Sequence, residues 1–231
     1  MTQSVLMLSG LLCDDTVWNG LTPALASDVS IHLRDFRGFD DLGRMAESVL
    51  ADAPPRFALV GHSMGARVAL EIYQRAPQRV ERLALLDTGV HPAKPGEAAG
   101  RQRLIELAQV EGMTALAREW LPPMVHPAFA TDPRVMQPLV AMVERMTPAI
   151  YVQQVRALLN RPDARALLPT ISCPTLIGVG REDRWSPLEQ HQEMAAQIPQ
   201  AHLEIFERSG HMAPYEAPDQ VANALRAWLA A

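Results

Sequence analysis

The stretch Gly61-His62-Ser63-Met64-Gly65 limits what this chain can fold into more than any other. The apolar run Phe57-Ala58-Leu59-Val60 precedes it, and residues 66–73 after it have the composition of a helix. A strand that turns directly into a helix through Gly-x-Ser-x-Gly must reverse sharply, because a side chain at either glycine would collide with neighbouring backbone. We therefore predict a tight turn that exposes Ser63 above the carboxyl end of a strand, as a nucleophile elbow does.

Strands and helices alternate on both sides of this turn. Apolar runs predict strands at residues 5–8, 29–33, 57–60 and 80–86, and helical spacing predicts helices at 14–25, 41–52 and 66–73. Near-continuous apolar strands joined by helices favour a mostly parallel sheet covered on both faces. The first part of the chain is therefore predicted to be an α/β domain.

The alternation stops at residue 88 and resumes near residue 171. Between them, proline-punctuated helical patterns cover residues 98–109, 113–121, 133–146 and 148–159, and afterwards strands at 175–179 and 202–206 alternate with helices at 187–197 and 218–229. An insert of this length is too long for a passive loop. We assign residues 1–87 and 171–231 to the α/β core, and 88–170 to a helical lid over its carboxyl edge.

Composition excludes several classes of partner. The 231 residues carry 21 basic and 26 acidic side chains, a net charge of −5, with no basic cluster to suggest nucleic acid or an anionic membrane. No run approaches the roughly 20 apolar residues that span a bilayer, and the first residues do not resemble a signal peptide. We expect a cytoplasmic protein in which Cys13 and Cys173 are reduced thiols and no metal is bound.

A serine hydroxyl needs a base within hydrogen-bond reach, and the base needs a carboxylate to orient it. His211 lies in Ser209-Gly210-His211, after the last predicted strand, and Asp183 lies in the loop after the strand before it. Both loops leave the same carboxyl edge of the sheet as Ser63. Asp87 also ends a strand there and is the alternative to Asp183.

The motifs Gly-His-Ser-Met-Gly, Gly-x-x-Asp-x-x-x-Pro and Ser-Gly-His, in this order, resemble those of the α/β-hydrolase family, in particular its small, lidded serine esterases. The resemblance covers nearly the whole chain. It implies that Ser63 is the nucleophile, His211 the general base and then acid, and Asp183 the residue that orients the imidazole. It also implies that Asp35-Phe36-Arg37-Gly38 is a structural turn. The chain begins at the strand that feeds the first catalytic loop, so we expect about six strands without the family's amino-terminal hairpin.

The resemblance also implies an oxyanion hole of two backbone N–H groups. Met64, the residue after the nucleophile, is expected to supply one of them. The other is expected from the loop after the first strand, where this chain has Ser9-Gly10 in place of His-Gly. We assign Leu11 to this role, and Leu12 is the alternative.

The remaining histidines have structural interpretations. We expect His62 to pack beside the nucleophile, His32 and His202 to be structural, His191 to be exposed on a polar helix, and His91 and His126 to lie in the lid. Large apolar residues could form either core or an acyl pocket under the lid. These are Trp18, Leu116, Trp120, Met124, Phe129, Met142, Met146 and Trp185.

These features predict a serine carboxylesterase that hydrolyses small to medium, apolar carboxylic esters through an acyl-enzyme. The expected partner is a small-molecule ester, and no cofactor is expected. The same residues are compatible with hydrolysis of a carbon–carbon bond, lactone or thioester, or with a cofactor-free lyase. A non-catalytic receptor that uses the pocket for binding is a third interpretation.

Overall fold

The computed structural model describes residues 3–27 and 29–231. In this part of the chain six strands form one sheet, in the order β2-β1-β3-β4-β5-β6, and every neighbouring pair is parallel. The strands are β1 (Gln3–Leu8), β2 (Val29–Arg34), β3 (Phe57–His62), β4 (Val80–Leu86), β5 (Thr175–Gly180) and β6 (Ala201–Phe206). The predicted α/β-hydrolase fold is confirmed, and its sheet is parallel throughout.

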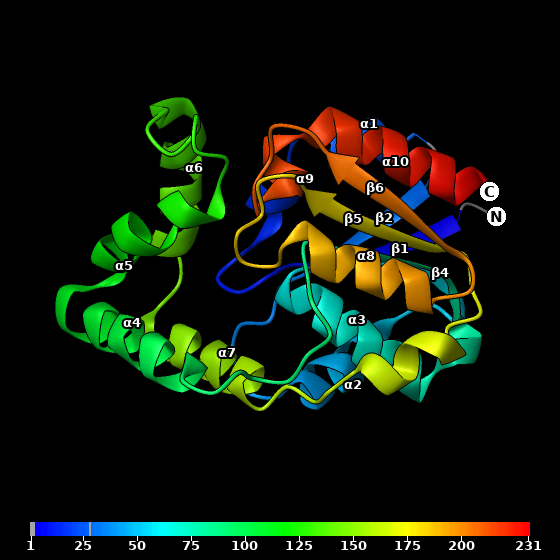
Figure 1. Ribbon diagram of the computed structural model, residues 1–231, viewed down its shortest axis with the longest axis horizontal. Coiled ribbons are helices and arrows are strands. Elements are labelled where there is room, and N and C mark those ends of the chain that lie inside the picture. Colours follow the sequence, from blue (N-terminus) through cyan, green and yellow to red (C-terminus); the bar gives the residue numbers. More distant parts are fainter. Residues whose placement is uncertain (1–2, 28) are drawn as a thin grey trace.

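Helices cover both faces of this sheet. Figure 1 shows α1 (Thr22–Leu25) and α10 (Pro218–Ala230) on one face, and α2 (Leu42–Asp52), α3 (Met64–Arg75) and α8 (Leu188–Gln197) on the other. All residues of the inner strands β3 and β5 are buried, because helices exclude water from both sides. Their apolar runs in the sequence reflect this double burial.

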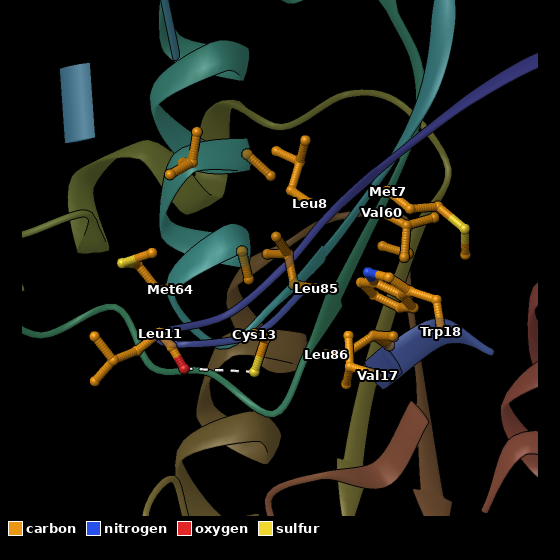
Figure 2. Close-up of a cluster of buried hydrophobic side chains, with 14 of the residues drawn as sticks. Met7, Leu8, Leu11, Cys13, Val17, Trp18, Val60, Met64, Leu85 and Leu86 are labelled. Carbon is orange, nitrogen blue, oxygen red and sulfur yellow. Dashed lines mark hydrogen bonds between the residues drawn. The ribbon is translucent and has the colours of Figure 1, made fainter. Parts of the chain in front are cut away.

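The predicted helix at residues 14–25 is wrong in its extent. The structure has a 3-10 helix at Asp15–Trp18 and only a short α1 after it. Gly20 separates them at a point where the chain passes so close to α10 that a Cβ atom would lie 2.8 Å from Pro218. The predicted apolar face survives, because Val17 and Trp18 still pack with side chains of β1, β3 and β4 (Figure 2).

Helices fill the segment between β4 and β5. They are α4 (Glu97–Glu111), α5 (Met113–Trp120), α6 (Pro133–Glu144) and α7 (Pro148–Leu159). Figure 1 shows them on the side toward which β5 and β6 point. The Arg145 guanidinium at the end of α6 donates two hydrogen bonds, of 2.8 and 3.0 Å, to the carboxylate of Asp14 in the loop after β1. The helical segment is thus tied to the edge of the core where the predicted site lies.

Two glycines set the turn between β3 and α3. A Cβ atom on Gly61 would lie 2.4 Å from the Cα of Ala66, and one on Gly65 would lie 2.1 Å from the carbonyl oxygen of Leu8. Both obstacles are backbone, so they cannot move aside as a flexible side chain would. The first turn of α3 therefore packs directly on the end of β1, as the Gly-x-Ser-x-Gly pattern predicts.

Replacing Gly65 with alanine should destabilise the fold by about 4 kcal/mol or more, because the backbone of β1 and α3 must separate. The matched control is Gly100→Ala, in the interior of α4, where an added Cβ would meet nothing within 4 Å. That change should stabilise the protein by about 0.5 to 1 kcal/mol, since alanine favours a helix. Urea unfolding of both variants measures the two free energies. Equal stability of the two variants would contradict the close packing of the turn.

Candidate active site

Ser63 occupies a backbone conformation that L-amino acids rarely adopt, with φ 55° and ψ −114°. Neighbouring strands and loops hold it there. The Ser63 N–H donates to the carbonyl of Leu86 at 2.9 Å, and the Thr88 hydroxyl donates to the Ser63 carbonyl at 3.1 Å. The conformation turns the serine side chain out of the sheet, above the carboxyl end of β3, and leaves it half-buried.

The structure brings together the three residues that the sequence proposed. Ser63 Oγ lies 2.8 Å from Nε2 of His211, and Nδ1 of the same imidazole lies 2.8 Å from Oδ2 of Asp183. They come from three separate loops at the carboxyl ends of β3, β5 and β6. His211 and Asp183 are buried, so little water competes for these hydrogen bonds.

Asp183 is held as a charged carboxylate. Its Oδ1 accepts hydrogen bonds from the backbone N–H groups of Trp185 and Ser186, both at 2.8 Å. Burial alone would raise the pKa of Asp183, but the neighbouring His211 and these hydrogen bonds hold it below its usual value. An ionised acceptor keeps the Nδ1 of His211 protonated, which leaves Nε2 to accept the proton of the serine.

Asp87, the alternative acid, has a different environment. Its Oδ1 accepts the backbone N–H of Gly180 at 2.9 Å, and its Oδ2 lies 3.9 Å from Nε2 of His62 and contacts no ring nitrogen of His211. The side chain is fully buried, and burial together with the charge of Asp183 raises its pKa well above the usual value. Asp87 therefore holds a proton more readily than Asp183 does.

Exchanging each acid for its amide separates the two roles. Asp183→Asn should reduce kcat by about 10³- to 10⁴-fold, because an amide does not favour the tautomer that the reaction needs. Asp87→Asn should cost far less, since Asp87 contacts no ring nitrogen of His211 and the amide oxygen can still accept from the N–H of Gly180. The measurement is kcat on one ester for both variants. A larger loss for Asp87→Asn would reassign the acid.

Hydrogen bonding of the backbone N–H groups separates Leu11 and Met64, the residues proposed for the oxyanion hole, from the alternative Leu12. The N–H of Leu12 is occupied, because it donates to Oε1 of Gln154 at 2.8 Å. The N–H groups of Leu11 and Met64 have no hydrogen-bond partner among the described residues. The geometry therefore favours Leu11 over Leu12. Gln154, buried on α7, also donates to the carbonyl of Phe36 at 3.1 Å, and nothing in the sequence indicated this link.

His62 packs beside the serine as expected. Its Nε2–H donates to the backbone carbonyl of His211 at 2.8 Å, and its ring meets the edge of Trp18. Burial lowers the pKa of His62 to about 3, so the ring stays neutral. It positions the loop of His211 and does not contact Ser63 Oγ.

The prediction that His191 is exposed is wrong. His191 is fully buried on the inner face of α8, where its Nε2 accepts the N–H of Thr88 at 2.9 Å and its Nδ1–H donates to Pro187. Burial lowers its pKa to about 4. Since Thr88 in turn binds the carbonyl of Ser63, this imidazole supports the strained turn. The polar composition of α8 hid this role, because the sequence does not show which neighbour uses the polar group.

The other histidines lie further from Ser63. His32 and His202 belong to β2 and β6, the two edge strands. His91 lies in the loop after β4 and lines a cavity, whereas His126 contacts Glu182 at 3.8 Å outside both cavities described below.

Glu216 is a site residue that sequence reasoning missed. It lies on α9 (Ala213–Glu216), a short helix that was not predicted. Its carboxylate accepts the backbone N–H groups of Gly210 at 2.9 Å and Met212 at 3.2 Å, on either side of His211. It also accepts the N–H of His126 at 2.6 Å, from the helical segment. One carboxylate thus joins the histidine loop to the segment above it.

This carboxylate gives the fold a specific pH dependence. Burial raises the pKa of Glu216 to about 7, whereas an unfolded glutamate titrates near pH 4.3. The folded state therefore binds more protons between these values, and this residue lowers the free energy of unfolding as the pH rises through them. In Glu216→Gln the free energy of unfolding should therefore fall by about 2 to 4 kcal/mol less over this pH range than in the native protein. Urea unfolding from about pH 4.5 to 7.5 measures it. Glu106→Gln, on the exposed surface of α4, is the control, and its free energy of unfolding should depend on pH as that of the native protein does. The same pH dependence in Glu216→Gln would contradict this role of Glu216.

Two hollows adjoin Ser63. A small recess of about 20 Å³ lies on the side of His211, and a larger cavity of about 480 Å³ lies on the side of Met64. Of the apolar residues singled out in the sequence, Trp120, Met124 and Trp185 line the small recess, while Trp18, Leu116, Met142 and Met146 are core. Basic side chains line much of the larger cavity.

Three further features concern metals, membranes and thiols. Among the described residues, no group of three or more His, Cys, Asp or Glu side chains is placed to hold a metal ion. No helix in the same part of the chain is long and apolar enough to cross a membrane. Cys13 and Cys173 are not paired with each other, and burial raises the pKa of the Cys13 thiol to about 12.

The fold and the arrangement of these loops define a class of hydrolytic enzyme. A model of the Alpha/beta hydrolase family matches residues 5–224. The chain therefore belongs to the α/β-hydrolase family and is a hydrolase.

Characterised relatives include esterases. The chain is 27% identical over 238 residues to a pimeloyl-[acyl-carrier protein] methyl ester esterase of Nitrosomonas europaea, covering 95% of this chain and 92% of that one. It is 28% identical over 172 residues to a 2-hydroxy-6-oxononadienedioate/2-hydroxy-6-oxononatrienedioate hydrolase of a Pseudomonas species, covering 71% and 60%. A solved thermophilic esterase of Thermogutta terrifontis superposes with a TM-score of 0.90 at 29% identity, covering 99% and 89%. Hydrolysis of an ester is therefore a plausible reaction for this fold.

Proposed function

We propose that this protein is a serine carboxylesterase that cleaves small to medium carboxylic esters through an acyl-enzyme. The observation that carries the proposal is the hydrogen-bonded row of Ser63, His211 and Asp183, with the N–H groups of Leu11 and Met64 beside it. Nucleophile, base, orienting acid and oxyanion donors are the parts that acyl transfer needs. The esterases among the relatives support the same reaction.

In the first half of the reaction, Oγ of Ser63 forms a bond to the ester carbonyl carbon while Nε2 of His211 takes the hydroxyl proton. The carbonyl oxygen becomes an oxyanion, which the N–H groups of Leu11 and Met64 stabilise. The intermediate collapses with cleavage of the bond between the carbonyl carbon and the alcohol oxygen. His211 gives its proton to that oxygen, and the alcohol leaves.

In the second half, water replaces the alcohol. His211 takes a proton from the water as its oxygen attacks the acyl carbon, and the same donors stabilise the second oxyanion. Cleavage of the bond to Oγ, with return of the proton from His211 to Ser63, releases the carboxylic acid. Asp183 remains ionised throughout and stabilises the transient imidazolium.

We also propose that residues 88–170 act as a lid. Support comes from the position of α4 to α7 on the carboxyl side of the sheet (Figure 1) and from the cavity walls, to which this segment contributes Trp120, Met124 and Leu158. A cover of this kind excludes water from the developing charges, which strengthens the interactions that stabilise them.

Replacing Ser63 with alanine tests the reaction directly. The native protein should hydrolyse p-nitrophenyl butyrate, and Ser63→Ala should lower kcat by about 10⁴- to 10⁶-fold, since among the described residues no other hydroxyl is hydrogen-bonded to His211. A fluorophosphonate probe should label the native protein alone, at Ser63, as detected by mass spectrometry. Retained activity in the variant would contradict the proposal. Absence of both labelling and hydrolysis would favour a receptor that uses the pocket only for binding.

A second reaction on the same residues has one supporting observation, the similarity to the Pseudomonas 2-hydroxy-6-oxononadienedioate/2-hydroxy-6-oxononatrienedioate hydrolase. A panel containing a simple ester, a thioester, a lactone and a vinylogous diketone separates the possibilities. Fastest turnover of the ester supports a carboxylesterase, whereas fastest turnover of the diketone assigns carbon–carbon bond hydrolysis.

A further inference from the structure

The larger cavity beside Ser63 carries an excess of positive charge. Its walls include the side chains of Arg67, Lys94, Arg101 and Arg161, and Lys94 is the only lysine of the chain. The acidic side chains of the lining are Glu97 and Asp87, and burial together with the charge of Asp183 raises the pKa of Asp87 well above its usual value. Four basic side chains thus face two acidic ones, so positive charge is in excess at the described lining of the cavity.

Other carboxylates do not neutralise this excess. Asp163 and Glu71 act electrostatically on Arg67, but each forms its ion pair with an arginine outside the cavity wall, Arg165 and Arg75 respectively. Burial, and next the charge of Arg161, lower the pKa of Arg67 to about 9. Arg67 therefore remains charged at neutral pH and is repelled by Arg161, an arrangement that costs free energy in the absence of a bound anion.

Hydrogen bonds within the protein account for the burial of only two of the three arginines, Arg67 and Arg161. Arg67 donates to the carbonyls of His91 and Pro162, and Arg161 forms two hydrogen bonds, of 2.8 and 2.6 Å, with the carboxylate of Glu97. These contacts hold both ends of the helical segment and account for their burial.

Arg101 is different. It reaches only Oε1 of Glu97, through Nε at 2.9 Å and Nη2 at 2.8 Å, and Arg161 already uses that oxygen. Its Nη1 has no hydrogen-bond partner among the described residues. The residue is 9% exposed and borders both the larger cavity and the recess at Ser63. A buried guanidinium with unused donors facing a cavity is suited to a carboxylate.

The reaction geometry decides which part of the substrate meets these arginines. His211 must protonate the leaving oxygen, so the alcohol lies on the His211 side, where the recess of about 20 Å³ admits only a small group. The acyl chain then extends the other way, past Met64 into the cavity of about 480 Å³. Leu158 and Pro95 also line this cavity and offer apolar contact to such a chain.

We propose that the substrate is the ester of a small alcohol with an acid that bears a second carboxylate at its far end, and that the cavity around Arg101 binds that carboxylate. The inference rests on the proposed esterase reaction and narrows its substrate to monoesters of dicarboxylic acids.

The test compares two esters that differ only in the distal charge. For each acid from succinate to suberate, kcat/KM is measured for the monomethyl ester and for the dimethyl ester. At the best chain length the native protein should prefer the monoester by about 10- to 100-fold, the range expected for hydrogen bonds to a charged group. Arg101→Gln should lower this ratio by about tenfold, Arg101→Glu should bring it below one, and Arg101→Lys should retain part of it.

Arg103→Gln is the matched control. Arg103 lies on the same helix, is exposed, and pairs with Glu119 outside the cavity, so the ratio should not change. A ratio of one or less in the native protein at every chain length, with the dimethyl esters hydrolysed, overturns the proposed substrate and leaves the esterase reaction intact. An unchanged ratio in Arg101→Glu overturns the role of the cavity, provided that its thermal melt matches that of the native protein.

A binding measurement distinguishes failure of the reaction from failure of the substrate assignment. Calorimetry on Ser63→Ala should give a Kd for monomethyl adipate at least about tenfold below that for dimethyl adipate. If the variant shows this difference in Kd but the native protein hydrolyses neither ester, the result supports the anion site and overturns the esterase reaction. No difference in binding overturns the anion site.

Discussion

The strained backbone of Ser63 is the constraint on which the rest of the site depends. A non-glycine residue at φ 55° and ψ −114° costs on the order of 1 to 3 kcal/mol and persists only where its surroundings over-determine it. Here the absence of Cβ atoms at Gly61 and Gly65 lets the start of α3 rest on the ends of β1 and β3. Thr88, itself held by His191, then fixes the Ser63 carbonyl. The exposed hydroxyl is thus a consequence of backbone packing across three strands.

Burial sorts the ionisable groups around that hydroxyl into charged and neutral ones. The imidazole and two backbone N–H groups hold the pKa of Asp183 below its usual value, whereas burial and the charge of Asp183 raise the pKa of Asp87 well above it. His62 and His191 are neutral because the desolvation of a charged ring outweighs the hydrogen bonds to backbone carbonyls and the charge of Asp183 that favour it. In the proposed reaction the imidazolium of His211 would therefore be stabilised by Asp183, the carboxylate that contacts its Nδ1.

Local sequence patterns were sufficient for the fold and for the residues whose side chains meet at Ser63. Each of these features is encoded by residues that are close together in the sequence. They are the elbow, the loops of Asp183 and His211 at strand ends, and the helix boundaries at proline. The contacts that position them were not predictable, because Gln154, His191 and Glu216 each act on a partner brought close only by folding. The error at His191 has this origin. A polar residue in a polar helix reads as exposed unless its buried partner, here the N–H of Thr88, is known.

The cavity arginines connect the core to the helical segment, and the proposed anion site would couple substrate binding to the position of that segment. Arg67 belongs to the core helix α3, yet its hydrogen bonds go to the carbonyls of His91 and Pro162, near the two ends of the segment. Arg161 lies at the second of these ends and its charge repels Arg67. On the proposed substrate, a carboxylate bound at Arg101 in the same cavity would offset that repulsion, so the bound substrate would stabilise the position of the segment seen here. On the proposed function, the core supplies the reaction, and the charge at its border with the inserted helices selects the acid.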